Sequence, residues 1–359
     1  MRVRTNVAKP IMHSNRINSC QQNLMRLGRG IMTLGAISLC AVLFPERKGS
    51  AQYGKEAAQI EARELSEPIL PIPQRTALNA EKVALGRKLF HEPVLSKDNS
   101  LSCASCHSLK QGGVDHRPHS LGINKAEGPI NSPTVFNSGL NFRQFWDGRA
   151  ESLEEQIEGP TQSPIEMGSN WQEIIKKLNN TAGYRSEFKK IYPDGLQKVN
   201  VKNAIAEFER SLLTPNSRFD KYLRGDNTAI NASEREGYRK FKSFGCISCH
   251  QGVSIGGNMF QKLGIIEDYF KDRGPVHNVD LGRFNVTGDE EDKHVFKVPS
   301  LRNVEKTAPY FHDGSKETLE EAVQAMAKYQ LGRRLSNKDV EDIVLFLRTL
   351  TGEYEGTQL

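Results

Sequence analysis

Apolar residues recur every three to four positions along several stretches of the chain, the spacing of one face of an α-helix. One stretch follows Asn79, a residue type that often caps helices, and another follows a capping box formed by Ser233 and Glu236. A further capping box, Thr318-Leu-Glu-Glu321, predicts a helix that includes Met326. The other predicted helices cover residues 80–90, 201–213, 233–241 and 340–350.

These predicted helices form two similar sets. Gly86-Arg-Lys-Leu-Phe90 in the first set resembles Gly237-Tyr-Arg-Lys-Phe241 in the second, and each set ends in a closing helix after a long irregular stretch. Strand signals are few. We therefore predict an all-α fold of two similar domains with long loops, residues 79–220 and 221–359. Residues 52–78 are polar and then proline-rich, which predicts a linker or surface strap.

Each predicted domain contains a Cys-x-x-Cys-His motif, at residues 103–107 and 246–250. At this spacing two thiols can each add to a haem vinyl group, and the adjacent histidine can bind the iron. A single Cys-x-x-Cys also suits zinc or thiol–disulfide chemistry, but two copies with an attached histidine favour haem. We predict two covalently bound haems c and hence two cytochrome c-like domains. The predicted attachment and iron-binding residues are Cys103, Cys106 and His107, and Cys246, Cys249 and His250.

The chain's formal charge of +6 is concentrated at its beginning. Residues 1–51 hold eight Lys/Arg and one acidic residue, so the remainder carries about −1 and offers no footprint for nucleic acid. A short apolar run over residues 31–44, followed by Gly49-Ser-Ala51, predicts a signal peptide over residues 1–51. An uncleaved membrane anchor remains the alternative. We expect a periplasmic protein whose mature form has no spare thiol and is not membrane-bound.

The sixth position on each iron decides between electron transfer and catalysis. Met326, on its predicted helix, is a candidate ligand of the second haem, although a methionine at helical spacing also suits a core. Between residues 131 and 167 lie Trp146, Gln156 and Glu166, each of which also has an ordinary structural interpretation.

The chain contains several longer motifs: Asn131-Ser-Pro-Thr-Val-Phe-Asn137, Gln144-Phe-Trp-Asp-Gly-Arg149, Gly159-Pro160, Glu166-Met167, Gly282-Arg-Phe284 and Thr307-Ala-Pro-Tyr-Phe-His312. Through these motifs the chain resembles the bacterial di-haem cytochrome c peroxidases over residues 80–352. The resemblance implies an enzyme that reduces hydrogen peroxide to water at the first haem. It also implies that the second haem receives electrons from a small cytochrome c or copper protein (a cupredoxin), and that the protein is a homodimer.

The same resemblance implies roles for individual residues. Glu166 and Gln156 match the distal acid–base pair at the first haem, and Trp146 matches a tryptophan between the haems. His312 matches a histidine that affects activity without binding iron, and Met326 matches the sixth ligand of the second haem. A calcium ion is implied at the domain interface, with ligands from Asn131, Thr307 and Pro309, the last two through backbone carbonyls.

The chain departs from the family at Ile123, where many members have a histidine that occupies the first iron until the second haem is reduced. Isoleucine cannot bind iron, so we expect a first haem without this histidine plug; His116 or His119 in the same loop is the alternative. Two other functions are kept open: a di-haem electron-transfer cytochrome, and a maturation enzyme that oxidises a partner protein. The latter group uses tyrosine where this chain has Met326.

Overall fold

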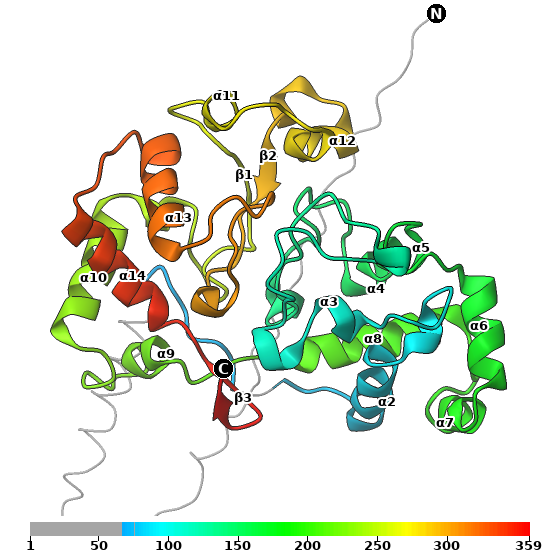
Figure 1. Ribbon diagram of the computed structural model, residues 1–359. Helices are drawn as coiled ribbons and strands as arrows, with labels where there is room; N and C mark the ends of the chain where they lie inside the picture. The colour runs from blue at the N-terminus through cyan, green and yellow to red at the C-terminus, as the bar shows by residue number, and fades with distance from the viewer. Residues whose placement is uncertain (1–66, 75) are drawn as a thin grey trace, which may run out of the picture. The chain divides into compact units, whose positions relative to one another are not determined.

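The structure is a computed structural model that describes residues 67–74 and 76–359, and its described part is mostly helical (Figure 1). The signal peptide expected over residues 1–51 lies outside the described residues. The helices up to the middle of the chain are α2 (Ala80–Phe90), α3 (Cys103–Cys106), α4 (Leu153–Gln156), α5 (Glu158–Gln162), α6 (Trp171–Asn180), α7 (Tyr184–Ile191), α8 (Lys198–Ser211) and α9 (Arg218–Leu223).

The later elements are again mostly helices, joined by short 3₁₀ turns. They are α10 (Ala232–Ser243), α11 (Tyr269–Arg273), α12 (Phe284–Thr287), α13 (Leu319–Ala325), a π-helical turn (Met326–Gln330) and α14 (Asn337–Arg348). Two antiparallel ribbons complete the fold, β1 (Phe260–Lys262) with β2 (Val295–Lys297) and β3 (Glu353–Tyr354) with β4 (Thr357–Gln358). In the part of the chain that is described, no helix has the length and apolar character needed to cross a membrane.

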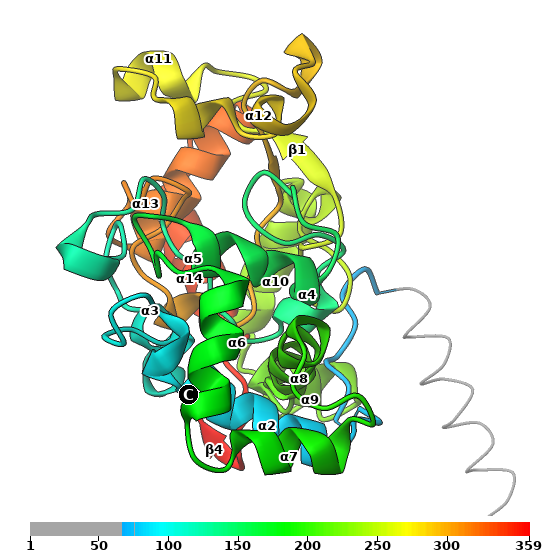
Figure 2. The same cartoon turned by 90° about the vertical axis from the view of Figure 1, so that its right-hand side faces the viewer.

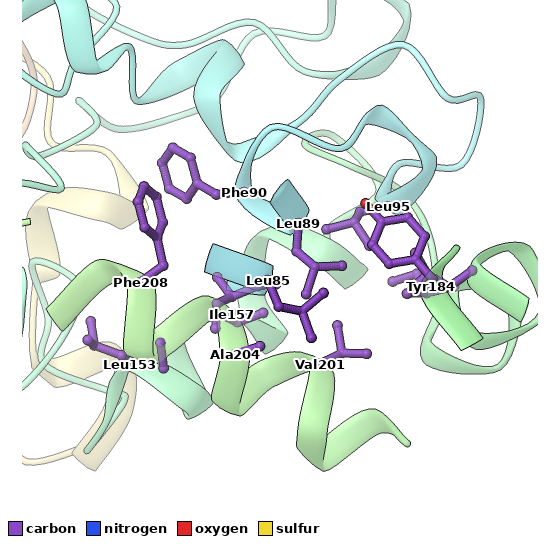
Figure 3. Close-up of a cluster of buried hydrophobic side chains, with 14 of the residues drawn as sticks. Leu85, Leu89, Phe90, Leu95, Leu153, Ile157, Tyr184, Val201, Ala204 and Phe208 are labelled. Carbon is purple, nitrogen blue, oxygen red and sulfur yellow. The ribbon is translucent and has the colours of Figure 1, made fainter. Parts of the chain in front are cut away.

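Helices α2 and α8 pack side by side and bury the first hydrophobic cluster between them (Figure 1, Figure 2). Their backbones approach closely at Gly86, where an added Cβ would lie 1.8 Å from the carbonyl oxygen of Ala204. Figure 3 shows Leu85, Leu89 and Phe90 of α2 facing residues of α8 and α4 across this cluster. This half therefore needs a glycine at the helix crossing.

The second half repeats this arrangement with α10 and α14. At Gly237 an added Cβ would lie 1.9 Å from the carbonyl oxygen of Asp342, so the two helices also cross at a glycine. The second hydrophobic cluster takes most of its residues from 219–350. The two clusters agree with the expected repeat, and the division into cytochrome c-like domains at residue 220 remains a prediction.

The two ends of the described chain each pack against the half to which they are not adjacent in sequence. Ile69 is fully buried in the second cluster, and the Leu70 carbonyl accepts a hydrogen bond of 2.8 Å from the Arg302 guanidinium. At the other end, Tyr354 packs its ring 5.0 Å from that of Phe136, against the first cluster. The proline-rich stretch thus lies along the second half for residues 69–72.

The helices predicted from apolar spacing are all present, and all but the 80–90 helix have shifted ends. The 80–90 helix and the Thr318–Glu321 capping box are confirmed. The third helix starts earlier than predicted because Asn231, not Ser233, is its N-cap, in a capping box with Glu234. Helices α6 and α7 were not predicted; they lie within a stretch that we expected to be irregular.

Candidate functional site

The first Cys-x-x-Cys-His motif forms the one-turn helix α3 and the residue after it. The Nδ1 atom of His107 lies 3.3 Å from the carbonyl oxygen of Gly113, in a turn where Gly112 and Gly113 both have positive φ. Burial lowers the pKa of His107, which keeps the imidazole neutral, and the carbonyl contact leaves Nε2 as the free ligand atom. His107 is thus oriented as an iron ligand would be.

The second motif shows the same local design. The Nδ1 atom of His250 lies 3.4 Å from the carbonyl oxygen of Ile255, and burial lowers the pKa of His250 to about 4. Helix α10 before the motif ends at Ser243, and Gly245, with a φ of 101°, leads the chain into the turn at Cys246. Both histidines therefore present a neutral ring with its outer nitrogen directed away from the backbone.

A cavity of about 250 Å³ lies beside the second motif. Cys246, Cys249, His250 and Met326 all line it, as do many apolar side chains. Met326 begins the π-helical turn that follows α13, a local widening that is often found at functional sites. Two thiols, a neutral imidazole and a thioether around one apolar cavity are the donor set of a c-type haem with histidine and methionine ligands, so the residues fit the expected group.

Glu166 lies near the first motif, as the resemblance implies. Burial raises the pKa of the Cys106 thiol, and the nearby carboxylates of Asp115 and Glu166 raise it further. Burial also raises the pKa of Glu166 itself, against the opposing effects of a Ser163 hydrogen bond and the Arg149 charge. A carboxyl group with a raised pKa in such a place suits proton transfer.

The backbone of Ile123 contacts Glu166, whereas its side chain packs against Gly168. Its N–H donates a 2.8 Å hydrogen bond to the Glu166 carbonyl oxygen. Its side chain is 6% exposed and covers Gly168, where an added Cβ would lie 2.3 Å from the isoleucine Cδ1. The two alternative loop histidines have other partners: Nδ1 of His116 lies 3.0 Å from the Ala308 carbonyl oxygen, and Nδ1 of His119 lies 3.1 Å from Glu127.

Gln156 and Trp146 complete the set expected around the first haem. Gln156 is the last residue of α4 and is half-buried. Trp146 donates from Nε1 to the Asn131 carbonyl oxygen at 2.8 Å, and it lines the cavity beside the second motif. Its ring centroid lies 6.3 Å from that of His312. Trp146 and His312 therefore both border the cavity beside the second motif.

His312 is 2% exposed and contacts Asp280, with 2.7 Å between Nε2 and Oδ1. Burial lowers the pKa of His312, and Asp280 opposes this effect. Asp280, His312 and Asp313 lie close enough to hold a metal ion. Arg273 already pairs with both carboxylates, at 2.6 Å and 2.9 Å, so this cluster is charge-compensated without a metal. Asp280 was not expected from the sequence, since nothing in its spacing relates it to His312.

The three residues assigned to calcium border the same cavity. Asn131, Thr307 and Pro309 all line the cavity beside the second motif, although they come from distant parts of the chain. The Asn131 side-chain amide donates to the Arg117 carbonyl oxygen at 2.9 Å, which leaves its Oδ1 for another partner. Oxygen donors of this kind suit calcium.

A mostly helical protein with two oriented Cys-x-x-Cys-His sites has the features of a di-haem cytochrome, and three comparisons define its class further. A family model described as di-haem cytochrome c peroxidase matches residues 80–228. Cytochrome c peroxidase Ccp of Escherichia coli is 50% identical over 290 residues, which are 80% of this chain and 62% of that protein. Cytochrome c551 peroxidase of Nitrosomonas europaea is 47% identical over 289 residues, 80% of this chain and 85% of that protein.

Among solved structures, a MauG-like protein associated with microbial copper homeostasis superposes with a TM-score of 0.71 at 29% identity, covering 79% of this chain and 93% of that one. The chain belongs to the di-haem cytochrome c peroxidase family. The enzyme class predicted from the sequence, a cytochrome c peroxidase and hence an oxidoreductase, is confirmed, and the family description implies two haem groups.

Proposed function

We propose that this chain reduces hydrogen peroxide to water at the first haem, with electrons that enter through the second haem from a small cytochrome c or cupredoxin. The observation that carries the proposal is the position of Glu166, a carboxyl group with a raised pKa beside the first motif. The two haems, when bound, supply the iron that accepts and passes on electrons.

The protein residues handle the protons. Glu166 takes a proton from one peroxide oxygen and returns it to the other, so that two protons and two electrons convert one peroxide to two waters. The Gln156 amide, from the end of α4, orients the peroxide by hydrogen bonding. Trp146, which lines the cavity beside the second motif, is assigned to the electron path between the haems because the resemblance implies that role.

Both haems are proposed to be attached covalently, through Cys103 and Cys106 and through Cys246 and Cys249. His107 and His250 are the proposed iron ligands, with Met326 as the sixth ligand of the second haem. A calcium ion bound by Asn131, Thr307 and Pro309 is part of the proposal because the three residues line one cavity. A periplasmic location and a homodimer are retained as proposals that rest on the sequence alone.

The first haem is proposed to stay free of a protein ligand on its distal side. The support is the buried position of Ile123 against Gly168, together with the other partners of His116 and His119. The Ile123→His variant should therefore gain a lag in peroxide turnover that prior reduction of the second haem removes. A parent protein that already shows the same lag when fully oxidised contradicts this proposal.

Two other functions are less well supported. A pure electron-transfer cytochrome would leave Glu166 and Gln156 without a role beside the first motif. A maturation enzyme would carry tyrosine at the sixth position of the second haem, whereas Met326 lines that cavity. The peroxidase therefore accounts for more of the site residues.

The test of the peroxidase function is Glu166→Gln, which removes the acid–base group but keeps the shape. Peroxide turnover should fall by about 10²- to 10⁴-fold, the usual contribution of general acid–base catalysis. Haem content and the low-temperature EPR spectrum of the ferric protein should stay unchanged. Glu173→Gln, on helix α6, is the matched control and should retain full activity. An active Glu166→Gln enzyme would remove the basis of the mechanism.

A further inference from the structure

Lys297, the last residue of β2, is a buried lysine that none of the assigned roles uses. It is 7% exposed, and within residues 67–74 and 76–359 its ammonium group forms no hydrogen bond or ion pair. Burial alone lowers its pKa, to about 8, and no carboxylate opposes that effect. A buried cation without a counter-ion is costly, so this position calls for an anionic partner.

The backbone around Lys297 holds the side chain in one place. Its N–H donates to the Trp146 carbonyl oxygen at 2.7 Å, and the residue pairs with Phe260 across the β1–β2 ribbon. Successive side chains of a strand point to opposite faces. Phe296, the preceding residue, packs its ring 4.5 Å from that of His312, so Lys297 lies on the other face of the strand.

Lys297 also lines the cavity that contains Cys246, Cys249, His250 and Met326. Apart from the propionate groups, a haem is largely apolar, and these two carboxylates are the anions that it brings into such a cavity. The cavity therefore contains both a buried unpaired cation and the residues that fit a haem.

We propose that the Lys297 ammonium group pairs with a propionate carboxylate of the second haem, on the side next to Trp146, and thereby sets that haem's reduction potential. The inference rests on the proposed attachment of a haem at Cys246 and Cys249. A nearby positive charge favours the reduced haem, which carries one positive charge less than the oxidised one. Lys297 is thus a positioning and tuning residue, not a catalytic one.

The test is a potentiometric titration of the purified di-haem protein, followed separately at the spectral signals of each haem. Lys297→Gln removes the charge and leaves the propionate unpaired. The reduction equilibrium of the second haem should shift toward the oxidised form by about tenfold, which is about 59 mV for a one-electron couple. Its potential should also become pH-dependent near neutrality, because a buried unpaired carboxylate binds a proton more readily.

Lys271→Gln is the matched control, since Lys271 is an exposed lysine on helix α11 and is not among the described residues that line the cavity. It removes the same charge from the chain, and solvent screening should keep its effect below twofold. Lys297→Arg retains the charge and should leave the second haem's potential within about twofold of the parent. It also serves as the decisive variant if Lys297→Gln does not take up both haems.

Three results would overturn the inference. One is a Lys297→Gln potential that moves no more than that of Lys271→Gln. Another is a change in reduction potential that is confined to the first haem, because Lys297 would then pair with a propionate of the first haem. The third is a Lys297→Arg protein that takes up both haems but shows a tenfold shift. Failure of the proposed function would be recognised before the titration, because the parent protein would then contain fewer than two covalently attached haems per chain.

Discussion

At the scale of single residues, Glu209 shows how strongly burial changes the pKa of a carboxyl group in the first half of the chain. It lies on α8 and is 6% exposed, and its Oε2 atom has no hydrogen-bond partner within the described residues. Burial and, to a smaller extent, the nearby Glu154 carboxylate raise the pKa of Glu209 to about 8, against the opposing effect of Arg210. Glu209 also raises the pKa of Cys103, after the larger effect of burial. The Glu209 carboxyl is therefore protonated in the folded protein at neutral pH.

This residue should make stability fall as pH rises. The unfolded chain releases the Glu209 proton above pH 4.5, whereas the folded protein keeps it until about pH 8. The folded state therefore binds more protons between these values, and rising pH favours unfolding. Glu209→Gln should remove this dependence and stabilise the protein at pH 7 by up to about 3 kcal/mol, at about 1.36 kcal/mol per pH unit.

Denaturant titrations at several pH values between 5 and 8 measure this effect. The exposed Glu187→Gln on helix α7 provides the comparison and should leave the slope of stability against pH unchanged. Equal slopes for the parent and Glu209→Gln would show that Glu209 is ionised in the folded protein.

At the scale of elements, the two halves depend on the same kind of helix crossing. Gly86 lets α2 approach α8, and Gly237 lets α10 approach α14. At both crossings the helices are too close to accommodate a side chain. The sequence repeat around these glycines therefore has a structural reason. It conserves the contact between the helix before each motif and the closing helix.

Replacing Gly237 with alanine should separate α10 from α14. The added Cβ would lie 1.9 Å from a backbone oxygen, which cannot move without displacing the helix, so we expect a loss of about 3 kcal/mol or more in the free energy of unfolding. Arg239→Ala, at an exposed position of the same helix, controls for alanine in α10 and should cost less than about 1 kcal/mol. A Gly237→Ala protein as stable as that control would mean that the helices can slide apart freely.

The elements also show what the sequence could predict. Helices with one apolar face next to a cap, such as α2 and α13, could be predicted because the cap and the buried residues lie within one short segment of the sequence. Helices α6 and α7 bury Trp171, Tyr184 and Phe188, but they are short and separated by a turn at Gly183, so their spacing did not stand out within a long irregular stretch. The start of α10 was misplaced because two neighbouring stretches both suit a cap.

The sequence predicted the haem motifs of the candidate site but not Lys297 or Asp280, and the difference has a physical reason. The haem motifs are local, so spacing alone identified Cys103 to His107 and Cys246 to His250. Lys297 and Asp280 acquire meaning only through neighbours that are distant in sequence, such as Trp146 and His312. No local pattern marks a lysine that will be buried without a partner.

At the scale of the whole described chain, one buried polar junction joins the halves. Asn137 and Asn303 occupy equivalent places after Pro-Thr-Val-Phe and Pro-Ser-Leu-Arg, and both have φ near +60°. Their side-chain amides donate to the same hydroxyl oxygen, that of Thr214, at 2.8 Å and 2.9 Å. Thr214 therefore connects the two repeats at the predicted boundary between them.

Thr214→Val keeps the shape but removes the shared acceptor. Two buried amides then lose a hydrogen bond, so we expect a loss of about 2 to 4 kcal/mol, and separate unfolding of the halves in calorimetry. Thr349→Val is the matched control, because its buried hydroxyl donates only to Phe346 within the second half. A Thr214→Val protein that still unfolds in one transition with parental stability would show that other contacts join the halves.

The crossed packing of the two ends has a consequence for how the protein is made. Chains emerge from the ribosome in sequence order, and domains generally fold as they emerge. Tyr354, which packs on the first cluster, is synthesised after nearly all of the second half. Ile69 is synthesised before the second cluster, in which it is buried. The second half can take up Ile69 as it is made, but the first half cannot complete its packing until the C-terminal residues have been synthesised. Final closure of the first half should therefore be one of the last steps in the maturation of the chain.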